Sequence, residues 1–398
     1  MGGCALLVAV VGLPQAAPPP TASAPAAVWQ GLTRADSGGT LRAQLDLAQA
    51  LLSQHAAAAA AARLRGVVRA HAESRDAWRL LAQALAEDGA YTEAAAAVRS
   101  ALRRWPSDRN LRYQQATLAL MLGREPEARR ELEQLTVAWP RFGAAQYSLA
   151  VDENDRGDFI AALRHLAAAE HAAGTSPQTA FLRGLLCERL HRFSAAEAAL
   201  RTALKGEASN IAAHVALARV LAKEGQQAAS ASEQLLAADL SAAQQDREKR
   251  RAQVAAWTQR GEQAALENRF SAALATYEAA LGLDAGDVTA HLGKGKVLYS
   301  AGEYPAARRE FQAAVVAAPF NPEAHYLLGL VAERLQETAT SRTEYGVALA
   351  LHPGDSEAAL ALVRLLRASG ETEAARRVLA TARQANPEDP DLRSALRP

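Results

Sequence analysis

The pattern that decides the fold fills residues 75–142, which read RDAWRLLAQALAEDGAYTEAAAAVRSALRRWPSD (75–108) and then RNLRYQQATLALMLGREPEARRELEQLTVAWPRF (109–142). Mostly small or apolar residues stand at positions 4, 7, 8, 11, 20, 24 and 27 of each stretch, and proline stands at position 32. In the first stretch these residues are Trp78, Leu81, Ala82, Leu85, Ala94, Val98, Ala101 and Pro106. A fixed period of 34 residues indicates that one small supersecondary unit is stacked many times along a single axis.

Each unit is predicted to be a pair of amphipathic helices. Positions 4 to 11 and positions 20 to 27 both follow helical spacing, and helices of this length are unstable without packed neighbours. Small residues at positions 8, 20 and 27 allow the two helices to approach closely, while bulkier residues at 4, 7, 11 and 24 fill the space between them.

The pattern resembles the tetratricopeptide repeat, whose consensus is Trp at position 4, Leu at 7, Gly at 8, Tyr at 11, Ala at 20, Phe at 24, Ala at 27 and Pro at 32. The later units match it well, with Gly295, Ala307, Phe311, Ala314 and Pro319 in one of them. The resemblance implies an all-α, right-handed solenoid of about ten helix-turn-helix repeats. These begin at residues 41, 75, 109, 143, 177, 211, 254, 288, 322 and 356.

Some residues depart from the pattern. Ser230 and Ser341 replace alanine at position 20, and Glu153 and Cys187 occupy position 11. The spacing between the units that begin at 211 and 254 is 43 residues, and the excess falls in the charged run 244–251. This run lacks proline and glycine, so it is predicted to lengthen the preceding helix and to bend or divide the array, or else to be a solvated extension without a partner.

The predicted organisation is a possible signal peptide (1–24), a flexible Pro/Ala/Ser/Gly leader (25–40), a first block of about six repeats (41–243), a charged helical insertion (244–253), a second block of four repeats (254–389) and a C-terminal tail (390–398). Residues 4–13 form a short apolar run that is followed by a small-residue site at 22–24, although no Lys or Arg precedes it. We therefore expect a periplasmic or secreted protein, with the cytoplasm as the alternative. The abundant arginine and alanine are compatible with a bacterial source.

Composition and motifs disfavour catalysis and nucleic-acid binding. The net charge is +1 with both signs interspersed, whereas nucleic-acid binding needs a strongly basic face. The sequence has no phosphate-binding loop, Cys-x-x-Cys, His-Glu-x-x-His or Gly-x-Ser-x-Gly motif. His214, His291 and His325 each stand at position 4, where packing between helices is favoured over a metal site. We expect no enzyme activity, no cofactor and no metal.

Position 5 points away from the core stripe of the first helix and should be polar, but it is often aromatic or apolar. The resemblance implies that this helix lines a concave groove. The predicted groove residues are Tyr113, Tyr147, Phe181, Leu292 and Tyr326, with Arg219, Lys223, Lys296, Arg334 and Arg364 as its basic part. Some position-5 side chains could instead pack against the next repeat.

The predicted function is a non-enzymatic protein–protein interaction scaffold that binds a peptide or a helix of another protein in this groove. The alternative is an envelope assembly or export factor whose groove binds polysaccharide, since aromatic faces also stack on sugar rings.

Overall fold

The computed structural model describes residues 40–53 and 55–395, so the predicted signal peptide and residues 25–39 of the leader lie outside the described residues. The described chain is helical throughout, and the prediction of an all-α solenoid is confirmed. The first helices of the repeats are α3 (Leu41–Ser53), α5 (Arg75–Glu87), α7 (Arg109–Met121), α9 (Gly143–Asp155), α11 (Pro177–Arg189), α13 (Ile211–Lys223), α16 (Val288–Ser300), α18 (Pro322–Arg334) and α20 (Ser356–Ala368).

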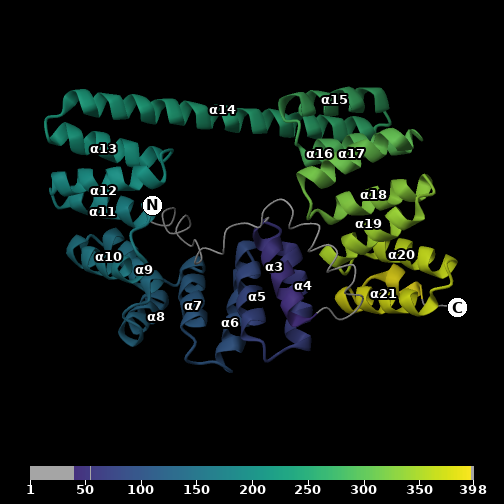
Figure 1. Ribbon diagram of the computed structural model, residues 1–398, viewed down its shortest axis with the longest axis horizontal. Coiled ribbons are helices and arrows are strands. Elements are labelled where there is room, and N and C mark those ends of the chain that lie inside the picture. Colours follow the sequence, from purple (N-terminus) through teal and green to yellow (C-terminus); the bar gives the residue numbers. More distant parts are fainter. Residues whose placement is uncertain (1–39, 54, 396–398) are drawn as a thin grey trace. The chain divides into compact units, whose positions relative to one another are not determined.

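The second helices are α4 (Ala57–Ala70), α6 (Tyr91–Leu102), α8 (Glu125–Ala138), α10 (Phe159–Ala173), α12 (Phe193–Gly206), α15 (Phe270–Leu283), α17 (Tyr304–Ala317), α19 (Thr338–Leu351) and α21 (Thr372–Ala385). Two further helices depart from this scheme, α14 (Gln227–Leu266) and the short α22 (Pro390–Ser394). Figure 1 shows the helices as successive antiparallel pairs. Each first helix starts at position 1 of its unit, and each second helix starts at position 17.

The described chain forms two compact units. Unit 1 contains residues 91–248, and unit 2 contains residues 40–90 together with 249–395. This division differs from the predicted blocks 41–243 and 254–389, because the first repeat lies with the C-terminal repeats. Helix α4 contacts α19, and the guanidinium group of Arg63 donates a hydrogen bond to the carbonyl oxygen of Ala350. This contact joins parts of the chain that are remote in sequence, so the repeat pattern did not predict it.

The charged residues 244–253 lie inside α14, a helix of 40 residues that continues into the first helix of the next repeat (Figure 1). The side chains of residues 242–253 are all exposed. Alanine, glutamine, glutamate and arginine favour helices, and a 3.0 Å hydrogen bond from Gln244 to Glu248 bridges one turn. In the described part of unit 1, no separate helix therefore follows the pair formed by α13 and the first part of α14.

A left-handed residue ends the first helix of every repeat. Position 15 has a positive φ in all ten repeats of the described chain, and six of these residues are glycine, for example Gly302 with φ 82°. The other four are His55, His191, Asn268 and Gln336, with φ between 54° and 63°. Glycine adopts this conformation without steric cost, and other residues do so at a cost of about 1–2 kcal/mol. The turn therefore persists where the sequence does not mark it with glycine.

The close packing predicted at positions 8 and 24 is present. A Cβ atom added to Gly295 would lie 2.4 Å from a ring carbon of Phe311, and one added to Gly329 would lie 2.7 Å from Tyr345. Both rings are completely buried. Because glycine at position 8 has no side chain, the aromatic ring at position 24 can occupy the space beside it.

The departures from the repeat pattern do not interrupt the helices. Ser230 and Ser341 are buried, and each hydroxyl group donates to the carbonyl oxygen of position 8 in the same repeat, Ala218 at 2.8 Å and Gly329 at 2.9 Å. Cys187 is buried, and burial raises the pKa of its thiol. Serine is tolerated at position 20 because its one polar group has a partner.

The predicted tail 390–398 begins with helix α22, which packs on α20 and α21. Its Leu392 is fully buried, and Asp389 caps its first turn by accepting hydrogen bonds from two backbone N–H groups. Helix α22 therefore covers the last repeat of unit 2, as the first helix of a following repeat would.

Candidate functional site

The predicted aromatic residues of unit 1 lie at position 5 of successive first helices, but their side chains are half-buried between repeats. The hydroxyl oxygen of Tyr113 lies 3.1 Å from that of Ser148, and its ring packs edge-on against Phe142 with 5.5 Å between centroids. Tyr147 and Phe181 each pack against a hydrophobic cluster that contains buried residues of their own repeat and of the next one. These rings therefore stabilise the stacking of the repeats and present only part of their surface to solvent.

Burial of Tyr147 changes its acid–base behaviour. Burial and the neighbouring Tyr113 raise the pKa of Tyr147 to about 12, from an ordinary value near 10. The neutral phenol is thus favoured in the folded state, and its contribution to stability is complete below pH 10 and is lost as the pH rises towards 12.

We expect Tyr147→Phe to reduce the fall in stability between pH 10 and 12, by at most about 1.4 kcal/mol per pH unit. Urea unfolding of the wild type and the variant at a series of pH values measures this difference. Below pH 9 the stability of the two proteins should depend on pH in the same way. If the difference in their free energies of unfolding is the same at pH 11 as at pH 9, the raised pKa of Tyr147 is contradicted.

In unit 2 the predicted groove residues divide between the surface and the core. Tyr326 is half-buried, with its ring centroid 5.8 Å from that of Tyr345, and burial together with Glu357 raises its pKa to about 12. Leu292 is buried in the hydrophobic cluster that contains Phe311. Leu292 is therefore a core residue in this structure and does not face solvent, because the following repeat covers this position.

The predicted basic residues are mostly paired with carboxylates of adjoining repeats. Arg219 makes two hydrogen bonds of 2.8 Å to Glu188, Arg364 lies 2.9 Å from Glu333, and Lys296 lies 2.5 Å from Glu323. Such exposed pairs contribute little stability, but they neutralise the cations. Three of the five residues predicted as the basic part of the groove are therefore engaged by carboxylates of this chain.

The other two basic residues differ from these pairs. Arg334 donates a 2.8 Å hydrogen bond to the hydroxyl oxygen of Tyr299, and its guanidinium group lies 5.8 Å from the centroid of that ring. Lys223 is exposed at the end of α13.

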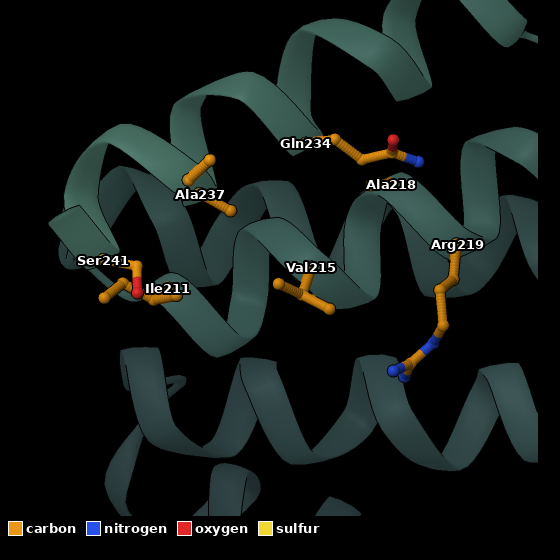
Figure 2. A pocket seen from close by; sticks show the side chains of 8 residues that line it. Ile211, Val215, Ala218, Arg219, Gln234, Ala237 and Ser241 are labelled. Carbon is orange, nitrogen blue, oxygen red and sulfur yellow. The ribbon is translucent and has the colours of Figure 1, made fainter.

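An open pocket of about 460 Å³ lies between α13 and the first part of α14 in unit 1. Figure 2 shows Ile211 and Ser241 at one end and Arg219 at the other, with Val215 between them. The lining residues are Ile211, Val215, Ala218, Arg219, Gln234, Ala237, Ala238 and Ser241. Val215 stands at position 5, like Tyr113, Tyr147 and Phe181, and it is 41% exposed. The pocket thus continues the line of position-5 residues at the end of unit 1.

Comparison with known proteins identifies the repeats. One tetratricopeptide repeat profile matches residues 45–109, 258–322 and 292–356, and a second matches residues 337–397. Together they cover slightly more than half of the chain. The chain belongs to the tetratricopeptide repeat family.

Several solved structures are similar to the chain at low sequence identity. The APC/C hetero-tetramer Cut9–Hcn1 is 12% identical over 93% of both chains, with a TM-score of 0.32. MamA is 16% identical over 52% of this chain and 95% of its own, with a TM-score of 0.29. The first repeat domain of Spaghetti (RPAP3), bound to the HSP90 peptide SRMEEVD, is 16% identical over 30% of this chain and 94% of its own, also with a TM-score of 0.29. No curated protein matches the chain in sequence.

Position 4 of these tetratricopeptide repeats joins one repeat to the one before it. The Nδ1 atom of His325 lies 2.7 Å from a carboxylate oxygen of Glu344 in the same repeat, and its Nε2 atom lies 2.9 Å from the carbonyl oxygen of Pro319 in the preceding repeat. His214 and His291 make the same two contacts with equivalent residues. Trp78 donates to the corresponding carbonyl oxygen of Ala72. These histidines therefore replace the consensus tryptophan as links between tetratricopeptide repeats.

The described residues contain no group of three or more His, Cys, Asp or Glu side chains arranged to hold a metal ion. Among the helices of residues 40–53 and 55–395, none has both the length and the apolar character that a bilayer crossing requires.

Sequence reasoning missed the α14 half of the pocket. Gln234, Ala237, Ala238 and Ser241 lie on the second helix of the repeat, whereas the groove residues predicted from the sequence all lie on first helices. The available signal was the 43-residue spacing, which shows that the next first helix does not begin at the regular place.

Proposed function

We propose that this tetratricopeptide protein is a non-enzymatic scaffold that binds a peptide or helix of another protein along the first-helix surface of unit 1. Family membership supports the general role of a protein-interaction scaffold. The observation that carries the specific site is the pocket at Val215, where the line of position-5 residues ends in an open, largely apolar surface. An apolar pocket with one charged residue at its edge suits a protein segment with mixed apolar and acidic side chains.

The half-buried rings of Tyr113, Tyr147 and Phe181, at position 5 of the three preceding repeats, give this surface rigid aromatic edges. Aromatic anchors contribute strongly to binding because they bury a large area and lose little conformational entropy. The same rings could stack on sugars, and oligosaccharide titration separates the two ligand classes. A peptide-binding scaffold should not respond to such a titration.

The test compares Tyr147→Ala and Phe181→Ala with the wild type by affinity capture from an extract of the native organism. We expect that the wild type captures one specific protein that the variants fail to capture. Each substitution of a central anchor should weaken the binding of that protein by roughly 1–3 kcal/mol. The dissociation constant of that protein, once identified, measures the effect.

The matched control is Val137→Ala, since Val137 lies on α8 of the same unit and is 81% exposed. Circular dichroism must show that all three variants are folded, because both rings also contact the core. Equal capture by folded ring variants and the wild type would contradict the proposed surface.

We also propose that the protein is exported to the periplasm or beyond, on the basis of the apolar run 4–13 and the small-residue site at 22–24. N-terminal sequencing of the protein purified from its native cells tests this, and we expect a mature chain that begins close after residue 24. A chain that retains residues 1–24 and lies in the cytoplasmic fraction would exclude export.

A further inference from the structure

Each first helix in the middle of unit 1 lies against one or both helices of the preceding repeat. Helix α9 contacts α7's partner α8, α11 contacts α9 and α10, and α13 contacts α11 and α12. The residue at position 3 is buried at each of these junctions, as Ala145, Thr179 and Ala213 show. The stacking surface therefore accepts one helix of 13 residues at a time, with a small residue facing the preceding pair.

Within the described residues, the same surface of the last pair in unit 1 has no such helix. Where a first helix would follow α13 and its partner, the chain continues as α14, and the pocket at Val215 occupies this position. In unit 2, by contrast, α22 covers the pair formed by α20 and α21, and its Leu392 is buried there. The open surface on α13 and α14 is thus an unfilled helix position, which we call the open helix slot and define by the eight residues that line the pocket.

The charge at the edge of the slot indicates what a fitting helix carries. Arg219 stands at position 9 of its repeat, and it is the only charged residue among the eight. At the corresponding place in unit 2, Lys296 at position 9 lies 2.5 Å from Glu323, which is position 2 of the next first helix. A helix in the open slot would place its second residue near Arg219. Glu188 accepts hydrogen bonds from the Nε and Nη2 atoms of this guanidinium group, and a carboxylate of the incoming helix would accept one from Nη1.

We propose that the open helix slot binds an amphipathic α-helix of a partner protein that carries an acidic residue in its first turn, a small apolar residue directly after it, and further apolar residues at helical spacing. The stacking surface is continuous with that of the preceding repeats, so the incoming helix extends the array by one helix. This inference rests on the proposed function and specifies its ligand and its position.

The probe is a synthetic peptide of residues 321–335, NPEAHYLLGLVAERL, which contains helix α18 with its cap Asn321, Glu323 at position 2 and the buried Ala324 at position 3. Binding to the full-length protein is measured by fluorescence anisotropy. We expect saturable binding that weakens by about tenfold in Val215→Asp and in Ala238→Arg, because the first buries a charge and the second fills the slot.

Changing Glu323 to Lys in the peptide should weaken binding by at least about threefold at low salt, since it removes the carboxylate that accepts from Nη1 of Arg219 and places a second cation beside this group. The control variant Val137→Asp places the same charge on an exposed apolar residue of unit 1 outside the slot, and its affinity should equal that of the wild type. Two different slot variants are used so that misfolding of one does not prevent a decision.

Absence of binding, or equal binding by the wild type and both folded slot variants, would overturn the proposal. Sedimentation at increasing protein concentration decides whether a second copy of the chain is the occupant. Self-association that Ala238→Arg abolishes would overturn the partner-helix assignment. If ring variants such as Tyr147→Ala lose partner capture while the slot variants keep it, the partner binds at the rings and not at the pocket, so the scaffold function stands and the slot inference fails.

Discussion

Replacing Phe311 by alanine is expected to lower the free energy of unfolding of unit 2 by about 3–5 kcal/mol. Phe311 is completely buried on α17, at position 24 of its repeat, and its ring packs in a cluster with Ala307, Leu328 and Val331. Removal of the ring leaves a cavity between helices whose backbone positions are fixed by the stacked repeats on either side. The loss therefore includes the transfer free energy of the ring and the cost of the cavity.

Urea unfolding of the full chain, followed by circular dichroism, measures this change. Hydrogen exchange in α16 and α17 shows whether the loss is local, because repeat arrays need not unfold as one cooperative body. Val316→Ala on the same helix is the control, since Val316 is 80% exposed and its truncation should change stability by less than about 0.5 kcal/mol. A Phe311→Ala variant as stable as this control would contradict the packing described at position 24.

Gly295→Ala is expected to destabilise unit 2 by about 1–3 kcal/mol, although alanine is the better helix former. A Cβ atom at Gly295 would lie 2.4 Å from one ring carbon of Phe311 and 2.7 Å from another, and the fully buried ring has no free space to move into. The matched control is Gly282→Ala in α15, where no atom lies within 4 Å of the new Cβ. This control should be more stable than the wild type by up to about 1 kcal/mol.

The two positions should be coupled, which a double-mutant cycle measures in the same unfolding experiment. In a Phe311→Ala background the ring that opposes the new methyl group is absent, so Gly295→Ala should become neutral or stabilising. Additive effects of the two substitutions would show that the glycine is not required for the approach of α16 and α17.

The 34-residue period predicted the helices accurately because it reports backbone geometry that recurs in every repeat. The first helices begin at the first position of their units, and small residues at positions 8 and 20 lie where the helices approach. Ser341 departs from the small apolar pattern in chemistry but fits in volume, and its hydroxyl group finds an acceptor within its own repeat. A pattern of residue types could not show this hydrogen bond.

The candidate site was only partly predictable, since exposure at position 5 depends on whether another helix packs on each repeat. Leu292 and Val215 occupy the same position, yet the first is buried by the next repeat and the second lines an open pocket. Likewise, the charge of Arg219 is balanced by Glu188, which lies 31 residues away in the sequence and in another repeat. These pairings are made between repeats, and the sequence of one repeat does not specify them.

The sequence by itself determined the family, the pair of helices in each repeat and the small-residue contacts between them, because these depend on short-range spacing along the chain. Only the tertiary structure decided which surfaces stay open. Helix α14 continues through the charged residues 244–253, so no first helix follows α13 in the described part of unit 1, whereas α22 covers the end of unit 2. Whether a side chain at position 5 is buried depends on whether another helix packs against its repeat. That contact is determined by the packing of whole helices and not by the sequence of one repeat.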